Sequence, residues 1–473
     1  MEYENFLNRG WPVNDIDKQI IERWKAAGRE GSPSLRTINH IRYRLMFESD
    51  RFPDVQVATQ EWFPEPPPRT GLPTLGRLHT EAGSRWFHAL DGVPFDYREI
   101  TAMGLMRLAI DRRWDEVEEF FEYCKQRRVT AIRPLLNLGS DLWTNKQRAN
   151  WFTEGDTFWR ALVPLAEKAA HYGLYTRYCL FGGVEPFVGH QLDWHRRPDV
   201  ITKNTTAITL MHTYLEQAVG TLRDVPSVLF EIANEPKEIG FGRESNVILE
   251  LGEHCADLAP DSMMNFGCAN DEDSLWYLRS PATFLDEHLR RMPADDFHLS
   301  VKRIIESPQV DQNVMPFMSG EWMNLGKGGG TESTATAFAT AAMLRLKHCI
   351  PSFHANCLLE PTIPDPATDA CLQAWTQALD MIPITVDGAP TNGHWKDSPF
   401  HERRDEVFPQ SDAAMPNHQG PIRIWGRVRR DGSYIGLSIR EPAGYDLIPD
   451  DGRTIETLHL ERWGDWQSRL LMA

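Results

Sequence analysis

Between about residue 76 and residue 385, short apolar runs alternate with longer segments of helical periodicity. The short runs are rich in β-branched and aromatic residues, and the longer segments place apolar residues three or four positions apart. This alternation predicts β–α units around a parallel sheet, and eight such units predict an α/β fold of the (β/α)8 TIM-barrel type. The candidate strands begin near Trp86, Thr130, Leu174, Ser227, Ser262, Ala282, Met315 and Ile350.

Helices are expected between these strands, because the intervening segments repeat apolar residues on one helical face. Only about 20 residues separate the fifth candidate strand from the sixth, so the fifth helix must be short. The expected helices are Asp115–Arg127, Asp156–Tyr172, Thr206–Leu222, Glu244–Leu258, Asp295–Glu306, Ser333–Lys347 and Ala367–Asp380.

The segments on either side of the barrel, residues 76–385, have a different texture. Residues 1–75 are interpreted as an N-terminal extension, with one amphipathic helix at Asp15–Ala27 and a proline-rich connector at 62–68. Residues 386–473 are interpreted as a small antiparallel β module packed on the barrel. In this module two alternating strands flank Asp431-Gly432, a hairpin signal, and further strands are expected at Thr457–Leu460 and Trp466–Leu471.

Composition excludes several classes of partner. The net charge of −17 argues against nucleic acid, since phosphate binding requires clustered Lys and Arg. No 18-residue apolar run predicts a membrane span, and the first residues lack the segments of a signal peptide. The expected location is cytoplasmic, unless the protein leaves the cell by another route. The seven cysteines are scattered without a C-x-x-C pair, which favours buried reduced thiols over disulfides or a metal site.

Two glutamates follow apolar strand-like runs. One run leads into Asn234-Glu235-Pro236, and the other leads into Gly320-Glu321-Trp322. The two glutamates are 86 residues apart, which is about three β–α units of roughly 30 residues each. They therefore belong to strands four and seven, which face each other across the barrel mouth. Functional groups of this fold lie at the carboxyl ends of the strands, so both carboxyl groups are expected over one cleft.

Two facing carboxyl groups are what glycoside hydrolysis requires. One must carry a proton for the leaving oxygen, and the other must be ionised to attack the anomeric carbon. A separation of about 5–5.5 Å gives retention through a covalent intermediate, whereas about 6.5–9.5 Å admits a water molecule and gives inversion. Mutual repulsion and unequal burial separate the two pKa values and assign the roles.

With these motifs, the segment 76–385 resembles clan A glycoside hydrolases, closest to the cellulase-like glycoside hydrolase family 5. The resemblance implies that Glu235 is the acid/base and Glu321 the nucleophile. It also implies that Asn234 binds the sugar 2-hydroxyl. An arginine is expected at the end of strand two, where the sequence has Arg133. Near a nucleophile, a guanidinium favours the ionised carboxylate and orients it.

Other positions match the family less closely. Strand six of the family presents His or Tyr, and here His288 is the candidate, with His298 as a competitor. Strand eight offers His354, but the tryptophan usual in the family is absent from residues 350–360, as is the His-x-Tyr pattern of strand six. Trp322 and Trp143 are candidates for stacking against a sugar, with core packing as the alternative for both.

The sequence thus predicts a retaining hydrolase of β-linked glycosides or polysaccharides. Its partner is a carbohydrate substrate, and no metal or organic cofactor is implied. Two alternatives remain. The barrel could bind carbohydrate without cleaving it, or the same two glutamates could serve a transglycosylase that excludes water.

Overall fold

The computed structural model describes residues 75–138, 149–184, 205–239, 246–267, 281–288, 315–320, 349–354 and 363–381, several single positions, and the backbone of six strands after residue 394. The expected helix Asp295–Glu306 and the proline-rich connector lie outside these residues, as does the helix Asp15–Ala27 apart from Ala26. The expected helix Ser333–Lys347 is described at four positions, which are all helical.

Eight parallel strands form one sheet in the order β8-β7-β6-β5-β4-β11-β10-β9. The outermost strands of this order also meet, because Thr283, just before β9, donates its backbone N–H to the Met264 carbonyl of β8 at 2.9 Å. The predicted (β/α)8 barrel is therefore confirmed. The strands are β4 (Glu99–Thr101), β5 (Ala131–Arg133), β6 (Tyr175–Phe181), β7 (Val228–Ala233), β8 (Met264–Asn265), β9 (Leu285–His288), β10 (Phe317–Gly320) and β11 (Ile350–Phe353).

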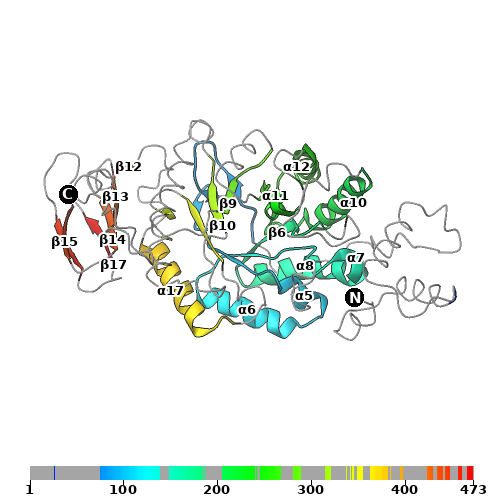
Figure 1. The fold of residues 1–473 in the computed structure, drawn as a ribbon, viewed down its shortest axis with the longest axis horizontal. Helices are drawn as coiled ribbons and strands as arrows, with labels where there is room; N and C mark the ends of the chain where they lie inside the picture. Colours follow the sequence, from blue (N-terminus) through cyan, green and yellow to red (C-terminus); the bar gives the residue numbers. More distant parts are fainter. Residues whose placement is uncertain are drawn as a thin grey trace.

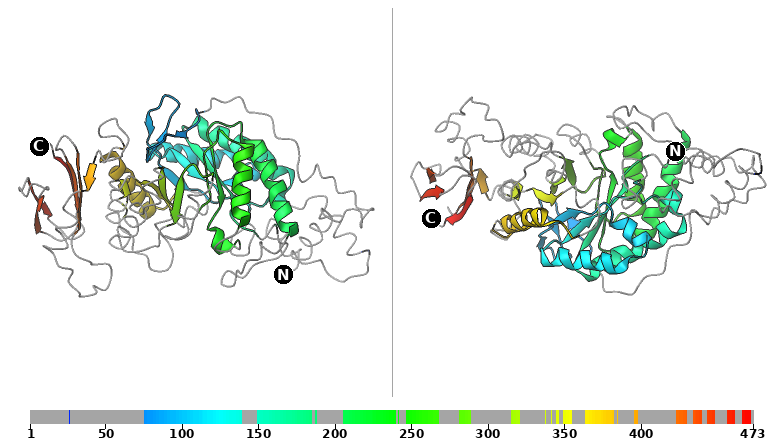
Figure 2. Two further views of the ribbon diagram at one scale, coloured as in Figure 1. Left: turned by 90° about the horizontal axis from the view of Figure 1, so that it is seen from above. Right: turned by 60° about the horizontal axis from the view of Figure 1, so that its bottom comes forward.

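Helices cover the outside of this sheet (Figures 1 and 2). Four long helices lie within two residues of their expected bounds: α6 (Trp114–Gln126), α8 (Asp156–His171), α10 (Thr205–Leu222) and α12 (Asn246–Leu258). The last helix of the barrel, α17 (Pro366–Met381), also lies where expected. The sequence patterns missed three short helices, α5 (Leu105–Ile110), α7 (Trp151–Glu154) and α11 (Pro236–Ile239).

Helix α8 shows how local sequence sets these elements. Asp156 lies in its first turn and Lys168 and His171 in its last, which matches the sign of charge that the helix dipole favours at each end. Gly173, with φ of 81°, then reverses the chain, and its N–H donates to the Ala170 carbonyl at 2.9 Å. The chain enters β6 two residues later, so the turn feeds directly into the barrel.

The strand expected near Trp86 is not a barrel strand, and this prediction was wrong. Phe87–His88 forms β2, the middle strand of a small antiparallel sheet with β1 (His79–Thr80) and β3 (Pro94–Phe95). The first barrel strand is β4 instead. The apolar run has a different cause: the Phe87 ring packs edge-on to Tyr97 and Phe284 at 4.9 and 5.1 Å between centroids.

This small sheet closes the amino-terminal end of the barrel. Phe87 and Tyr97 belong to one buried cluster with residues at or near the start of the barrel strands: Ala131, Tyr175, Leu229, Met263, Phe284, Met318 and Ile350. The barrel interior at the amino-terminal ends of the strands is therefore apolar, as is usual in this fold. The separate core between sheet and helices is also apolar and includes Trp159 and Tyr214.

Beyond the barrel, the structure describes strands of the expected C-terminal module. The predicted hairpin is confirmed: β13 (Arg423–Arg429) pairs antiparallel with β14 (Tyr434–Ile439). Strand β17 (Trp466–Leu471) pairs with β14, β12 (Trp395–Asp397) pairs with β13, and β15 (Ala443–Leu447) pairs with β16 (Glu456–Leu460). The domain boundaries and the packing of this module on the barrel stay predictions.

The cysteines agree with the expected reduced state. The five in the described part of the chain, Cys124, Cys179, Cys255, Cys349 and Cys371, are buried and form no disulfide. Burial raises the pKa of the Cys255 thiol to about 12, which disfavours the reactive thiolate. Among the helices described, none combines the length and apolarity that a bilayer span requires.

Candidate active site

Glu235 lies at the carboxyl end of β7, between the strand and α11. The Asn234 N–H donates to the Phe181 carbonyl of the neighbouring strand at 3.1 Å, and the Ile239 N–H donates to the Glu235 carbonyl at 3.1 Å. Between these two anchors Glu235 has φ of 46°, in the left-handed region. Its side chain is 23% exposed, so a ligand can reach the carboxyl group from the barrel mouth.

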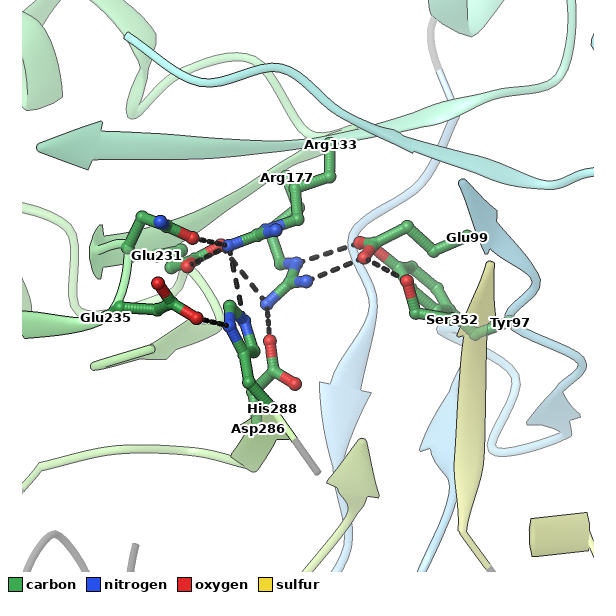
Figure 3. A network of polar contacts seen from close by, with 10 residues as sticks. Tyr97, Glu99, Arg133, Arg177, Glu231, Glu235, Asp286, His288 and Ser352 are labelled. Atoms are coloured by element: carbon green, nitrogen blue, oxygen red, sulfur yellow. Dashed lines mark hydrogen bonds and ion pairs between the residues drawn. The ribbon is translucent and has the colours of Figure 1, made fainter. Parts of the chain in front are cut away.

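His288 ends β9 and contacts Glu235. Its Nδ1 lies 3.2 Å from Oε1 of Glu235, and its Nε2 lies 3.5 Å from Nη2 of Arg133 (Figure 3). A guanidinium only donates, so the contact with Arg133 favours Nε2 as the acceptor and places the proton on Nδ1. In this tautomer His288 donates a hydrogen bond to the Glu235 carboxyl group and orients it.

Arg133, at the end of β5, joins β7 to this pair. Its Nε and Nη2 each donate to a Glu231 oxygen at 2.6 Å, and Nη2 also donates to Oδ1 of Asn234 at 2.8 Å. Because the arginine takes the Asn234 oxygen, the amide nitrogen is left as the hydrogen-bond donor of this side chain. Arg133 is fully buried, so its role here is to hold groups in place.

A layer of buried charges lies beneath these residues (Figure 3). Arg177 on β6 donates to both oxygens of Glu99 at 2.6 and 2.8 Å, and it also binds Asp286 and contacts Glu231 at 3.3 Å. Tyr97 and Ser352 donate to Glu99 at 2.9 and 3.1 Å. Burial raises the pKa of the Asp286 carboxyl, but the charges of Arg177, His288 and Arg133, together with the hydrogen bond from Arg177, more than offset this, and the net pKa is lowered.

Glu231, Asp286 and His288 have the composition of a metal site, with three candidate ligand atoms within 4.8 Å of one another. Both carboxylates, however, are engaged by guanidinium groups, Glu231 by Arg133 and Asp286 by Arg177. A cation at this point would face two arginines at close range. The cluster is therefore an ion-pair network that supports the site.

Of the remaining residues proposed from the sequence, one lies in the described part of the chain and three lie outside it. His354 follows β11 at the same end of the barrel and is 1% exposed, so it is a buried side chain at the rim. Glu321, Trp322 and Trp143 lie outside the described residues. Glu321 directly follows β10 in the chain, and the last residue of β10, Gly320, pairs with His288 of β9.

Four residues of the network were not singled out from the sequence: Glu99, Arg177, Glu231 and Asp286. A signal for some of them was present. Leu229, Glu231 and Ala233 alternate along β7 and so share one face, and Glu231 is the charged residue among them. Arg177 is likewise a charged residue within the mostly apolar strand β6. A charge inside an otherwise apolar strand marks a polar layer in the barrel interior.

Comparison with known proteins supports the fold. No protein-family model matches the chain, and no curated protein matches it in sequence. The chain is similar to the solved structure of a glycoside hydrolase, with a TM-score of 0.55 and 13% identity over 83% of this chain and 96% of the other. A family 5 glycoside hydrolase from Bacteroides vulgatus ATCC 8482 matches with a TM-score of 0.55 and 12% identity, over 83% and 92% of the two chains. The predicted resemblance is confirmed at the level of the fold.

Proposed function

We propose, from a barrel fold like that of family 5 glycoside hydrolases, that this chain hydrolyses β-linked glycosides with net retention of configuration. One observation carries the proposal. Glu235 is held at the carboxyl end of β7 by a strained backbone, receives a hydrogen bond from His288, and keeps its carboxyl group accessible. An oriented, accessible carboxyl group at the mouth of such a barrel is suited to acid–base chemistry.

In the proposed reaction, Glu235 gives its proton to the glycosidic oxygen as that bond breaks. Glu321 attacks the anomeric carbon and forms the glycosyl-enzyme, and Glu235 then removes a proton from the water that hydrolyses it. Asn234 donates from its amide nitrogen to a substrate hydroxyl, since Arg133 occupies its oxygen. His288 steadies Glu235 through both steps.

A panel of aryl β-glycosides and β-linked polysaccharides tests the proposal. The Glu321→Gln variant is expected to lose at least about 10³-fold in turnover, because a nucleophile acts as a unit with its partners. Glu235→Ala should lose activity and regain turnover of an activated aryl glycoside with azide, a nucleophile that needs no base. Glu116→Gln, on the exposed face of α6, is the matched control and should behave as the wild type.

The outcome distinguishes the alternatives. Near-normal turnover by Glu321→Gln would refute the assignment of the nucleophile. Binding of oligosaccharide without any turnover by the wild type would support a carbohydrate-binding barrel. Longer products in place of hydrolysis would indicate a transglycosylase. Inverted product configuration, read by NMR of the first product, would replace the covalent mechanism with direct attack by water.

A further inference from the structure

Two histidines face each other on the outer helices, apart from the network in the barrel. His212 of α10 and His254 of α12 place their Nδ1 atoms 2.9 Å apart, with ring centroids 5.1 Å apart and an angle of 34° between the planes. Both side chains are partly exposed. Two neutral imidazoles in this arrangement must share either a proton or a cation between the two nitrogens.

A neighbouring carboxylate fixes the orientation of one ring. Oε1 of Glu216 lies 3.4 Å from Nε2 of His254. This contact favours the proton on Nε2, which leaves the lone pair of His254 Nδ1 directed at His212. Metal-binding histidines are commonly held in this way, with the second ring nitrogen donating to a carboxylate, because that bond sets the tautomer and the ring orientation.

One glutamate can add an oxygen ligand. Glu250 precedes His254 by four residues, so it shares a helix face with that histidine. Glu250 is exposed and can turn.

We propose that His212 and His254 bind a divalent transition-metal ion of the nickel, copper and zinc group through their Nδ1 atoms. Metal–nitrogen bonds of about 2.0–2.1 Å at right angles place the two nitrogens about 2.9 Å apart, and tetrahedral angles place them about 3.4 Å apart. The observed distance fits the first geometry. Imidazole ligands select these ions over Mg²⁺ and Ca²⁺, which prefer oxygen.

Isothermal titration of the chelator-treated full chain with NiCl2 at pH 7.5 tests this site, because nickel accepts the right-angle geometry that the observed distance fits. The wild type should bind one more equivalent than His212→Ala or His254→Ala, whereas MgCl2 should give no binding at this site. The matched control is His171→Ala, because His171 is an exposed histidine on α8, and this variant should keep the full stoichiometry. Circular dichroism establishes that each variant is folded, and His212→Gln replaces any that is not.

Two further readouts separate a metal site from a hydrogen-bonded pair. Glu216→Gln should weaken nickel binding about 10-fold or more, since groups that orient a metal-bound histidine typically change the affinity by that factor. Nickel should also raise the melting temperature of the wild type and not that of His212→Ala, because the ion joins α10 to α12. Equal stoichiometry and equal thermal shifts in the two proteins would overturn the proposal and leave an N–H···N hydrogen bond as the whole interaction.

Discussion

Glu235 adopts a backbone conformation that L-residues rarely use. A non-glycine residue with positive φ costs about 1–3 kcal/mol and persists only where its surroundings hold it. Here the strand end on one side and the first turn of α11 on the other provide that constraint, through the hydrogen bonds of the Asn234 and Ile239 N–H groups. The strained backbone directs the side chain to the barrel mouth. The protein is therefore less stable at this position, but the carboxyl group is placed where a ligand can reach it.

Removing the strain should therefore stabilise the protein while abolishing the proposed activity. Glu235→Gly is expected to be more stable than Glu235→Ala by about 1 kcal/mol, since glycine adopts positive φ without a steric cost. Urea denaturation of the two variants measures this difference. An alanine variant as stable as the glycine variant would show that the position carries no strain.

Arg177 is fully buried and binds Glu99 and Asp286, which are also almost fully buried. Such pairs add little net stability compared with an apolar core, but removing one partner leaves the other charge unpaired in a region of low dielectric constant. Arg177 is therefore irreplaceable in this interior even if the network as a whole contributes little to stability.

Arg177→Met should destabilise the protein by about 3–5 kcal/mol, because it leaves buried carboxylates without their cation. The matched control is Arg113→Met, which breaks the half-exposed pair with Glu116 and should cost less than about 1 kcal/mol. Urea midpoints compare the two variants. If Arg177→Met is soluble and unfolds at the wild-type midpoint, the carboxylates must be neutral or hydrated in the folded protein.

Part of the site is predictable from the sequence. The motif around Glu235 and the arginine after strand two are both visible there, and the structure brings Arg133, Asn234, His288 and Glu235 together. The partners of Arg133 were not predictable, because pairing between Glu231 and Arg133 joins residues 98 positions apart and depends on strand register. Periodicity gives the face of a strand and not the neighbour across the barrel.

The bounds of the helices are predicted from the sequence far better than the position of the first barrel strand. Apolar spacing and turn residues are local, and α6, α8 and α10 depend on them. Strand β4 is three residues long and carries a buried Glu99 in its centre-facing position, so it lacks the apolar run that marks a strand. The stronger run at Trp86-Phe87 belongs to the sheet beneath the barrel, because aromatic side chains are needed there to fill its base.

Two helical glycines give a matched test of packing between elements. A Cβ at Gly252 of α12 would overlap the buried ring of Phe266, whereas a Cβ at Gly220 of α10 would meet nothing within 4 Å. Gly252→Ala should therefore destabilise the protein by about 1–3 kcal/mol, since the close-packed ring cannot move freely. Gly220→Ala should stabilise it by about 0.4–1 kcal/mol through helix propensity. Thermal unfolding of the two variants should shift in opposite directions, and shifts of the same sign would contradict the packing of α12 on Phe266.

The fold of the whole barrel depends on joining its first strand to its last. Strand β11 pairs with β4, with Phe353 opposite Ile100. On the outside, Arg127 and Tyr123 at the end of α6 both donate to Asp369 of α17, at 2.6 and 2.7 Å. These contacts join segments about 250 residues apart, so no local pattern predicts them. The alternation of eight strand and helix patterns predicts the barrel. The contacts of β11 with β4 and of α17 with α6 show how its first and last units are held together.

The closing ion pair should make stability depend on acid pH. Hydrogen bonds from Arg127, and then from Tyr123, more than offset burial and lower the pKa of Asp369 to about 2, against about 3.9 in an unfolded chain. A lowered folded pKa means that the stabilisation is complete above about pH 4 and is lost as the pH falls toward 2. Asp369→Asn should therefore cost about 1–2 kcal/mol at pH 6, with allowance for partial exposure, and almost nothing at pH 2.

Melting temperatures of the wild type, Asp369→Asn and the exposed control Asp257→Asn, recorded from pH 2 to pH 6, measure this effect. The wild-type and Asp369→Asn curves should converge as the pH falls, because protonation of Asp369 removes the same charge that the substitution removes. The control should run parallel to the wild type throughout. A constant gap between wild type and Asp369→Asn would mean that the aspartate acts through hydrogen-bond geometry alone, and that the charge on Asp369 contributes nothing to holding α6 against α17.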